Sequence, residues 1–209
     1  MTSPRIDPDA VMWSTPEAER SGRPLIVLLH GYGSHEGDLF ALSPALPLGA
    51  TIASLRAPIV GKPGFAWWLI GDGVGEPIQD EVDAAAHAVL AWLDTVEAPS
   101  ISLIGFSQGG AMALQLLRLA PERFTCAVNL AGFVVPGDHP GDAELARVRP
   151  PVFWGRGTAD TVIPDAAIER TEQWLPKHAD ATIRIYEGIG HAVSTPELSD
   201  LVAFLREHG

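Results

Sequence analysis

A serine between glycines follows a short apolar run near the middle of the chain. Residues 105–110 read Gly-Phe-Ser-Gln-Gly-Gly, directly after the apolar run Ile-Ser-Leu-Ile at residues 101–104. A helical pattern of Ala, Met and Leu begins at residue 111. A sharp strand-to-helix turn raises its central residue above a sheet and needs flanking residues without bulky side chains. We therefore predict that Ser107 is a nucleophile exposed at such a turn.

The Gly-x-Ser-x-Gly pattern alone is a weak signal, because a chain with 21 glycines contains it often by chance. The alternative is a tight glycine turn with an unreactive serine. The predicted strand before the pattern and the predicted helix after it favour the nucleophile.

A serine hydroxyl needs a base to remove its proton, and the chain offers seven histidines. His191 is the best placed, because it follows a predicted strand through the small-residue loop Gly-Ile-Gly at residues 188–190 and comes after Ser107 in the chain. His35 lies near the expected active face but precedes the serine, and His30 is expected to hold the loop that follows its strand. The others are expected to be surface or packing residues: His87, His139, His178 and His208.

The base needs an acidic residue that orients its ring, placed between serine and histidine in the chain and after a strand. Asp160 fits, because it ends the turn Arg-Gly-Thr-Ala-Asp that follows the apolar run at residues 152–155. Asp165 is the competitor. It stands next to Pro164, where we expect it to cap the following helix.

Acyl transfer also needs N–H donors aimed at the carbonyl oxygen as it becomes an alkoxide. The first predicted donor is the backbone N–H of Gln108, directly after the nucleophile. The second is the backbone N–H of Tyr32 in the segment His-Gly-Tyr-Gly at residues 30–33, where glycines allow a close approach.

These residues need a scaffold, and the alternation of short apolar runs with longer amphipathic runs predicts an α/β fold. We expect a mostly parallel central sheet with helices on both faces. Ligands bind beyond the carboxyl ends of such strands, where the candidate residues fall. The predicted strands are residues 24–30, 50–55, 100–105, 124–131, 151–155 and 181–187, with 11–14 as an antiparallel edge strand; the predicted helices are 36–46, 78–96, 108–120, 165–174 and 196–207; and the predicted loops are 57–77 and 132–142.

Length and composition limit the function classes. A chain of 209 residues suits a single domain spanning residues 1–209, and 46% hydrophobic with 19% charged residues predicts a folded globule. The net charge of −12 argues against nucleic acid and anionic membrane surfaces as partners. Cys126 stands in an apolar run and is expected to be a buried thiol. Residues 1–10 lack a signal-peptide pattern, and no apolar run reaches the roughly 18 residues of a membrane span, so we expect a cytoplasmic protein without stable membrane insertion.

Together these motifs resemble the phospholipase/carboxylesterase family of the α/β-hydrolase superfamily, which includes the acyl-protein thioesterases. The resemblance rests on residues 29–33 and 105–110, on Gly-Arg-Gly-Thr-Ala-Asp at 155–160 with Val162 and Pro164, and on Gly190 and His191 followed by Val-Ser at 193–194. It runs in matching order from about residue 25 to the C-terminus. It implies an α/β-hydrolase fold without a large cap domain and a serine carboxylesterase for short or medium acyl esters, with thioesters as a further class, acting without metal or cofactor on a small-molecule ester substrate.

The resemblance also covers an aromatic motif, Gly-Phe-Ala-Trp-Trp at residues 64–68. It implies that Phe65, Trp67 and Trp68 line the acyl pocket. The alternative for each ring is a core position under a loop.

Two other functions use the same residues. One is an acyltransferase or perhydrolase with the same triad and an acceptor other than water, which product ratios with water, alcohol and peroxide would distinguish. The other is a catalytically silent protein that binds an apolar ligand in the same cleft. Labelling by a fluorophosphonate separates the second from an enzyme, because a silent domain has no activated serine. The sequence leaves the oligomeric state open.

Overall fold

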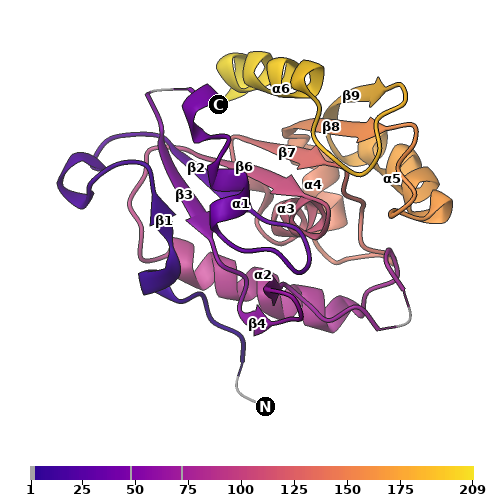
Figure 1. Cartoon of the computed structure of the whole chain (residues 1–209), viewed down its shortest axis with the longest axis horizontal. Coiled ribbons are helices and arrows are strands. Elements are labelled where there is room, and N and C mark those ends of the chain that lie inside the picture. Colours follow the sequence, from indigo (N-terminus) through magenta and orange to yellow (C-terminus); the bar gives the residue numbers. More distant parts are fainter. Residues whose placement is uncertain (1–2, 48, 72) are drawn as a thin grey trace.

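One seven-stranded sheet organises the protein in this computed structural model, which describes residues 3–47, 49–71 and 73–209. The strand order is β1-β3-β2-β6-β7-β8-β9 (Figure 1). Every neighbouring pair is parallel except β1 and β3, which pair antiparallel at the edge. Positions 1 and 2 of the predicted N-terminal segment and position 72 of the predicted loop 57–77 lie outside the described residues.

The strands form where the sequence is apolar and rich in β-branched residues. β2, β3 and β7 are buried along their whole length, as expected of central strands covered on both faces. The predicted strands are confirmed to within two residues at each end, the antiparallel edge strand included. Their bounds are β1 Met12–Trp13, β2 Leu25–Leu29, β3 Thr51–Leu55, β6 Ile101–Phe106, β7 Cys126–Leu130, β8 Pro151–Gly157 and β9 Asp180–Tyr186.

Helices cover both faces of the sheet, as predicted (Figure 1). One apolar core joins one face of the sheet to α2 (Gln79–Leu93), α3 (Gln108–Leu119), α4 (Asp142–Val148) and α5 (Asp165–His178). A second core joins the other face to α1 (Gly37–Phe40) and α6 (Thr195–His208). No large cap domain interrupts these elements in the described part of the chain.

Three segments differ from the sequence prediction in their elements, and α5 also ends four residues beyond the predicted limit at residue 174. The predicted helix 36–46 is only α1 followed by a 3-10 turn at Ser43–Ala45, because Pro44 has no N–H to continue the helix. α4 was not predicted. The predicted loop 57–77 contains a small hairpin of β4 (Ile59–Val60) and β5 (Phe65–Ala66).

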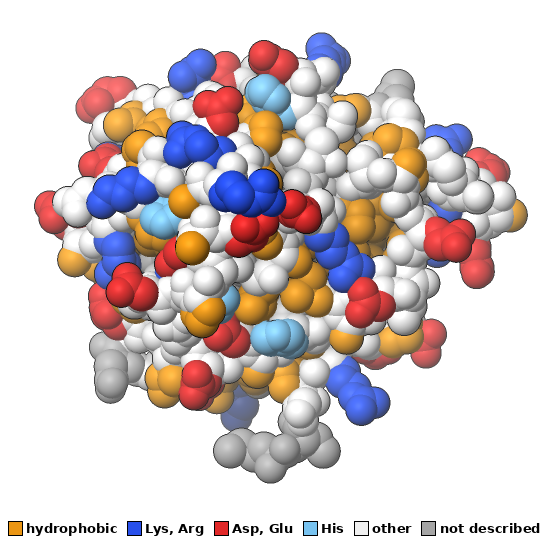
Figure 2. Space-filling model, turned by 180° about the vertical axis from the view of Figure 1, so that it is seen from behind, with side chains coloured by type: hydrophobic (Ala, Val, Ile, Leu, Met, Phe, Trp, Pro, Cys, Tyr) orange, Lys and Arg blue, Asp and Glu red, His pale blue; other side chains and the backbone are white. Residues whose placement is uncertain are grey.

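The molecular surface mixes both signs of charge. Figure 2 shows acidic and basic side chains interspersed over the face opposite to the view of Figure 1, with hydrophobic atoms between them. Among the described residues, the helices are too short or too polar to cross a bilayer.

Candidate active site

Ser107 occupies a strained turn between β6 and α3. Its backbone has φ 55° and ψ −116°, a region that non-glycine residues rarely adopt. The flanking glycines permit this turn, because a Cβ at Gly105 would overlap the carbonyl oxygen of Gly109, and a Cβ at Gly109 would overlap that of Leu29. The N–H of Ser107 donates to the carbonyl oxygen of Leu130 on β7, at 2.8 Å. The predicted strand-to-helix turn is therefore present, with Ser107 at its apex.

His191 and Asp160 come from different loops and meet in a hydrogen bond. The Nδ1 atom of His191 lies 2.7 Å from Oδ2 of Asp160, and the two side chains are 17% and 2% exposed. The other oxygen of Asp160 accepts the backbone N–H groups of Val162 at 2.8 Å and Ile163 at 3.2 Å. Because the carboxylate oxygen accepts a hydrogen bond from Nδ1–H, the lone pair of the neutral imidazole is on Nε2.

The imidazole and the serine hydroxyl line one cavity. His191, Ser107 and Phe106 all belong to its wall, and the ring centroids of Phe106 and His191 are 4.9 Å apart. Within the part of the chain that the structure describes, no direct hydrogen bond joins Ser107 to His191. Catalytic hydrogen bonds are often longer without substrate and shorten in the substrate complex.

The competing residues lie elsewhere. Asp165 is exposed in the first turn of α5, where Pro164 and not Asp165 is the N-cap residue. His35 is exposed and accepts the N–H of Gly37 through Nδ1, and it is not part of the cavity wall. The other alternative histidines also lie outside this wall: His87, His139, His178 and His208.

His30 holds the loop that carries the predicted oxyanion donor, as the sequence predicted. It is fully buried; its Nδ1 donates to the carbonyl oxygen of Gly31 at 2.7 Å, and its Nε2 accepts the N–H of Ala57 at 3.1 Å. Burial lowers the pKa of His30 below its ordinary value. The neutral ring therefore links two loops through hydrogen bonds, and both of its nitrogens are occupied by them.

Tyr32 and Gln108 line the same cavity as Ser107, and no backbone acceptor among the described residues pairs with their N–H groups. Their loops lie close together, because a Cβ at Gly31 would be 3.5 Å from the Cβ of Ser107 and 3.2 Å from the ring of Phe106. Two unpaired N–H groups beside a nucleophile can receive a developing oxyanion.

The cavity beside Ser107 has a volume of about 260 Å³ and a mainly apolar wall. Polar groups stand at one part of the wall, where the hydroxyl of Ser34 donates to Oδ2 of Asp38 at 2.7 Å. The apolar part is made by six side chains: Trp68, Ile70, Val74, Phe106, Phe133 and Val162.

Of the three aromatic residues predicted to line the acyl pocket, only Trp68 lies on this wall. Trp67 is fully buried in the core, and its indole N–H donates to the carbonyl oxygen of His30 at 2.9 Å. Phe65 belongs to β5 and pairs with Ser34, and the guanidinium of Arg56 lies 4.7 Å above its ring. Phe65 and Trp67 therefore contact the loop at residues 30–34 and do not line this cavity.

The side chain of Gln108 has a role that the sequence did not predict. Its Oε1 accepts the backbone N–H of Trp67 at 2.9 Å, and its Nε2 donates to the carbonyl oxygen of Trp68 at 2.8 Å. Gln108 is 4% exposed, so both bonds are shielded from water. Gln108, directly after Ser107, thus holds the backbone of Trp67 and Trp68, of which Trp68 lines the cavity.

Arg170 on α5 joins two loops of the cavity wall from behind. Its Nε donates to the carbonyl oxygen of Val134 at 3.1 Å, next to Phe133, and its Nη2 donates to that of Gly75 at 2.6 Å, next to Val74. Both Phe133 and Val74 contact the cavity. No sequence pattern indicated this arginine, because its two partners are 36 and 95 residues away in the chain.

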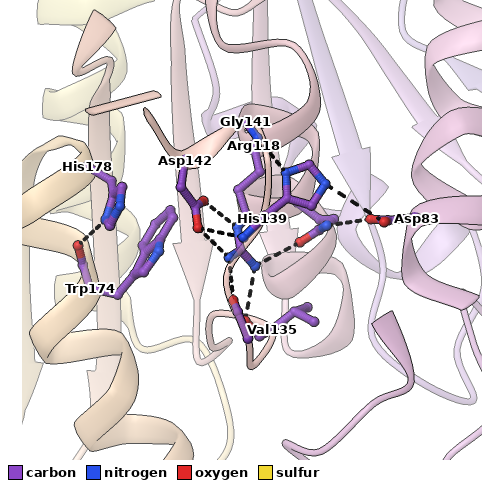
Figure 3. A network of polar contacts seen from close by, with 10 residues as sticks. Asp83, Arg118, Val135, His139, Gly141, Asp142, Trp174 and His178 are labelled. Atoms are coloured by element: carbon purple, nitrogen blue, oxygen red, sulfur yellow. Dashed lines mark hydrogen bonds and ion pairs between the residues drawn. The ribbon is translucent and has the colours of Figure 1, made fainter. Parts of the chain in front are cut away.

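Another arginine, the buried Arg118 on α3, holds the loop that carries Phe133. Figure 3 shows its guanidinium between the carboxylate of Asp142 and the carbonyl of Val135. Nε and Nη2 donate to Asp142 at 2.7 and 2.8 Å, Nη1 donates to Val135 at 3.1 Å, and Nη2 also donates to Gly137 at 2.7 Å. Burial opposes ionisation of Asp142, yet the hydrogen bonds from Arg118 hold the pKa of its carboxyl below the usual value.

Comparison with known proteins places this arrangement in a family. The sequence profile of the phospholipase/carboxylesterase family matches residues 74–209. The acyl-protein thioesterase 1 of Kluyveromyces lactis is 30% identical over 205 residues, which cover 87% of this chain and 90% of the relative. The chain belongs to the phospholipase/carboxylesterase family. This family membership confirms the resemblance that the motifs gave.

Other relatives agree. Esterase YpfH of Escherichia coli is 26% identical, with 90% of this chain and 84% of the relative aligned. The match to the acyl-protein thioesterase 1 of Saccharomyces cerevisiae, 28% identical, spans 54% of this chain and about half (51%) of that relative. These names are all those of esterases or thioesterases, and the family places the chain among the carboxylic ester hydrolases.

Solved structures share the fold. The crystal structure of esterase PE8 superposes with a TM-score of 0.78 at 27% identity, covering 98% of this chain and 100% of that one. The Bacillus cereus carboxylesterase, at 21% identity, has the same fold with a TM-score of 0.80, covering 94% and 93% of the two chains. The fold is therefore that of the α/β-hydrolases.

Proposed function

We propose that this protein hydrolyses carboxylic esters through an acyl-enzyme, with Ser107 as nucleophile, His191 as general base and Asp160 as the residue that orients the base. The observation that carries the proposal is the hydrogen bond of 2.7 Å between His191 and Asp160, beside a serine in a strained turn on the wall of the same cavity. We further propose that residues 1–209 act as a single α/β-hydrolase domain, because all seven main strands share one sheet.

In each half of the proposed reaction His191 accepts one proton from the attacking group and then donates it to the departing group. Ser107 attacks the acyl carbon while Nε2 of His191 takes the hydroxyl proton, and the backbone N–H groups of Tyr32 and Gln108 bind the oxyanion. His191 then gives the proton to the departing alcohol or thiol, which leaves the acyl group on Ser107. Water attacks this ester with the same base, and the acid is released as Ser107 recovers its proton.

The cavity supports short to medium acyl groups. Its volume of about 260 Å³ and its apolar side chains suit a hydrocarbon chain of limited length. Thioesters enter the proposal because the relatives from Kluyveromyces lactis and Saccharomyces cerevisiae are named acyl-protein thioesterase 1. Oxygen esters enter it because the Escherichia coli relative is named an esterase.

The test measures hydrolysis of p-nitrophenyl esters and matching thioesters with graded acyl length. Ser107→Ala and His191→Ala should each lower kcat by about four to six orders of magnitude, as in other serine triads. Asp160→Asn should also lose most activity, whereas its matched control Asp165→Asn, at an exposed carboxylate five residues away, should keep it. Near-normal turnover by Ser107→Ala on every ester would reject the assignment.

A further inference from the structure

The cavity beside Ser107 contains one carboxylate without a neutralising cation. Asp38 lies on its wall, and no Lys or Arg does among the described residues. Its Oδ2 accepts the hydroxyl of Ser34, and Asp38 takes part in no ion pair within the described chain. Asp38 is exposed to solvent, and its carboxylate carries a charge at the cavity wall that no described Lys or Arg neutralises.

The basic groups on adjacent elements are already paired. The guanidinium of Arg56 donates through Nε and Nη2 to the two carboxylate oxygens of Glu36. Arg170 donates to Glu76 and to two backbone carbonyls behind the wall. Neither arginine has its charge available to neutralise Asp38, and neither contributes to the cavity wall.

The rest of the wall suits an organic cation. Tyr32 and Trp68 add aromatic rings, and the apolar side chains near them favour methyl groups over hydration water. A quaternary ammonium has little hydration to lose and is attracted both by a carboxylate and by aromatic faces. A carboxylate or sulfonate on the substrate would instead meet the charge of Asp38 at close range.

We propose that this cavity selects esters that carry an ammonium group over neutral esters of the same shape, and neutral esters over anionic ones, with Asp38 as the residue that binds the cation. The proposal rests on the proposed function, because the selectivity can act only if esters react at Ser107. Ser34 is a positioning residue, since its hydroxyl holds Oδ2 of Asp38 at 2.7 Å.

The experiment compares kcat/KM for esters that differ only in charge. Butyrylcholine is compared with its neutral isostere 3,3-dimethylbutyl butyrate and with anionic 2-sulfoethyl butyrate, so that the charge lies in the alcohol. In the second arm the charge lies in the acyl group. The cationic ethyl ester of trimethylglycine is compared there with its neutral isostere, the ethyl ester of 3,3-dimethylbutanoic acid. Each ratio is measured for the wild type and for Asp38→Asn, which keeps an acceptor for Ser34, so that intrinsic differences in ester reactivity cancel.

We expect the cation-to-neutral ratio in at least one arm to fall by about 3- to 10-fold in Asp38→Asn, the range for an exposed charge interaction with aromatic support. The anion-to-neutral ratio should rise. If the ratio falls in the first arm, Asp38 binds the alcohol part of the ester; if it falls in the second arm, Asp38 binds the acyl part. Glu144→Gln removes the same charge from α4, outside the cavity wall, and should leave both ratios unchanged.

Equal ratios in the wild type and Asp38→Asn, in both arms, would overturn the inference. An equal fall in Glu144→Gln would also overturn it, because the effect would then come from net charge. Failure of the proposed function looks different: the wild type would hydrolyse no neutral ester, or Ser107→Ala would hydrolyse it equally well. The melting temperature of each variant, with the turnover of the neutral ester, shows that the protein is folded.

Discussion

The variant Gln108→Met separates two roles of Gln108, the oxyanion contact proposed for its backbone N–H and the hydrogen bonds of its side chain. The backbone N–H of residue 108 is the proposed oxyanion donor and remains in the variant. The side-chain amide is lost, and with it the bonds to Trp67 N–H and Trp68 C=O at 2.9 and 2.8 Å. Methionine has a similar length and fills the same space, so the change is mainly one of hydrogen bonding.

The expected loss of stability follows from the burial of these bonds. Each buried backbone group that loses its partner costs about 1 to 3 kcal/mol, so the two together should cost about 2 to 6 kcal/mol. For a protein of this size, 1 kcal/mol shifts the melting temperature by about 2 to 4 °C, which predicts a fall of about 4 to 24 °C. The kcat for a short ester should fall far less than in Ser107→Ala, and KM should rise because Trp68 is no longer held.

The assay is thermal unfolding followed by circular dichroism, together with kcat and KM on p-nitrophenyl acetate. Gln173→Met is the matched control, because Gln173 is exposed on α5. A melting temperature of Gln108→Met equal to that of the wild type would refute the role of the side chain. A loss of kcat as large as that of Ser107→Ala would refute the separation of the two roles.

Three further perturbations test other contacts. Arg170→Ala should release the loops at Val134 and Gly75 and raise kcat/KM for long acyl esters relative to short ones by about 3- to 10-fold. The control Arg147→Ala, at a surface arginine, should leave the preference for acyl length unchanged. An equal shift in both variants would contradict the proposed role of Arg170 in holding the two loops. Burial raises the pKa of Glu197 to about 7, so the unfolded chain loses this proton first and stability falls as pH rises from about 4.5 to 7. Glu197→Gln should remove this fall and be more stable than the wild type at pH 8 by about 1 to 2 kcal/mol after solvent screening, in urea unfolding at pH 5 and 8; an unaltered pH slope would contradict the assignment. Gly109→Ala should fail to give soluble folded protein, because its Cβ would overlap a backbone oxygen, and a variant with the wild-type melting temperature would show that the turn has room.

The sheet could be predicted from sequence because its central strands are buried on both faces. Runs such as Leu25–Leu29 and Ile101–Phe106 are almost wholly apolar, so their limits are visible without knowledge of their neighbours. α4 was missed because it has only seven residues and buries a single side chain, Leu145, which leaves no helical period to detect. The predicted helix 36–46 was too long because apolar spacing outweighed Pro44 in the prediction.

Candidate residues at strand ends were predictable for the same reason, since the carboxyl ends of parallel strands meet at one edge. The sequence therefore indicated Ser107 and His191, which line one cavity, and Asp160, which is hydrogen-bonded to His191. It could not indicate which aromatic rings line the cavity. That choice depends on the pairing of Phe65 with Ser34 and on the bond from Trp67 to a carbonyl 37 residues earlier.

The most direct test of the account is covalent labelling with a fluorophosphonate followed by peptide mapping by mass spectrometry. A serine activated by a histidine and an aspartate reacts with this reagent, whereas an ordinary serine does not. We predict one adduct, on Ser107, that forms rapidly in the wild type and is lost in His191→Ala. An unmodified Ser107, or an adduct that forms equally fast without His191, would contradict the triad.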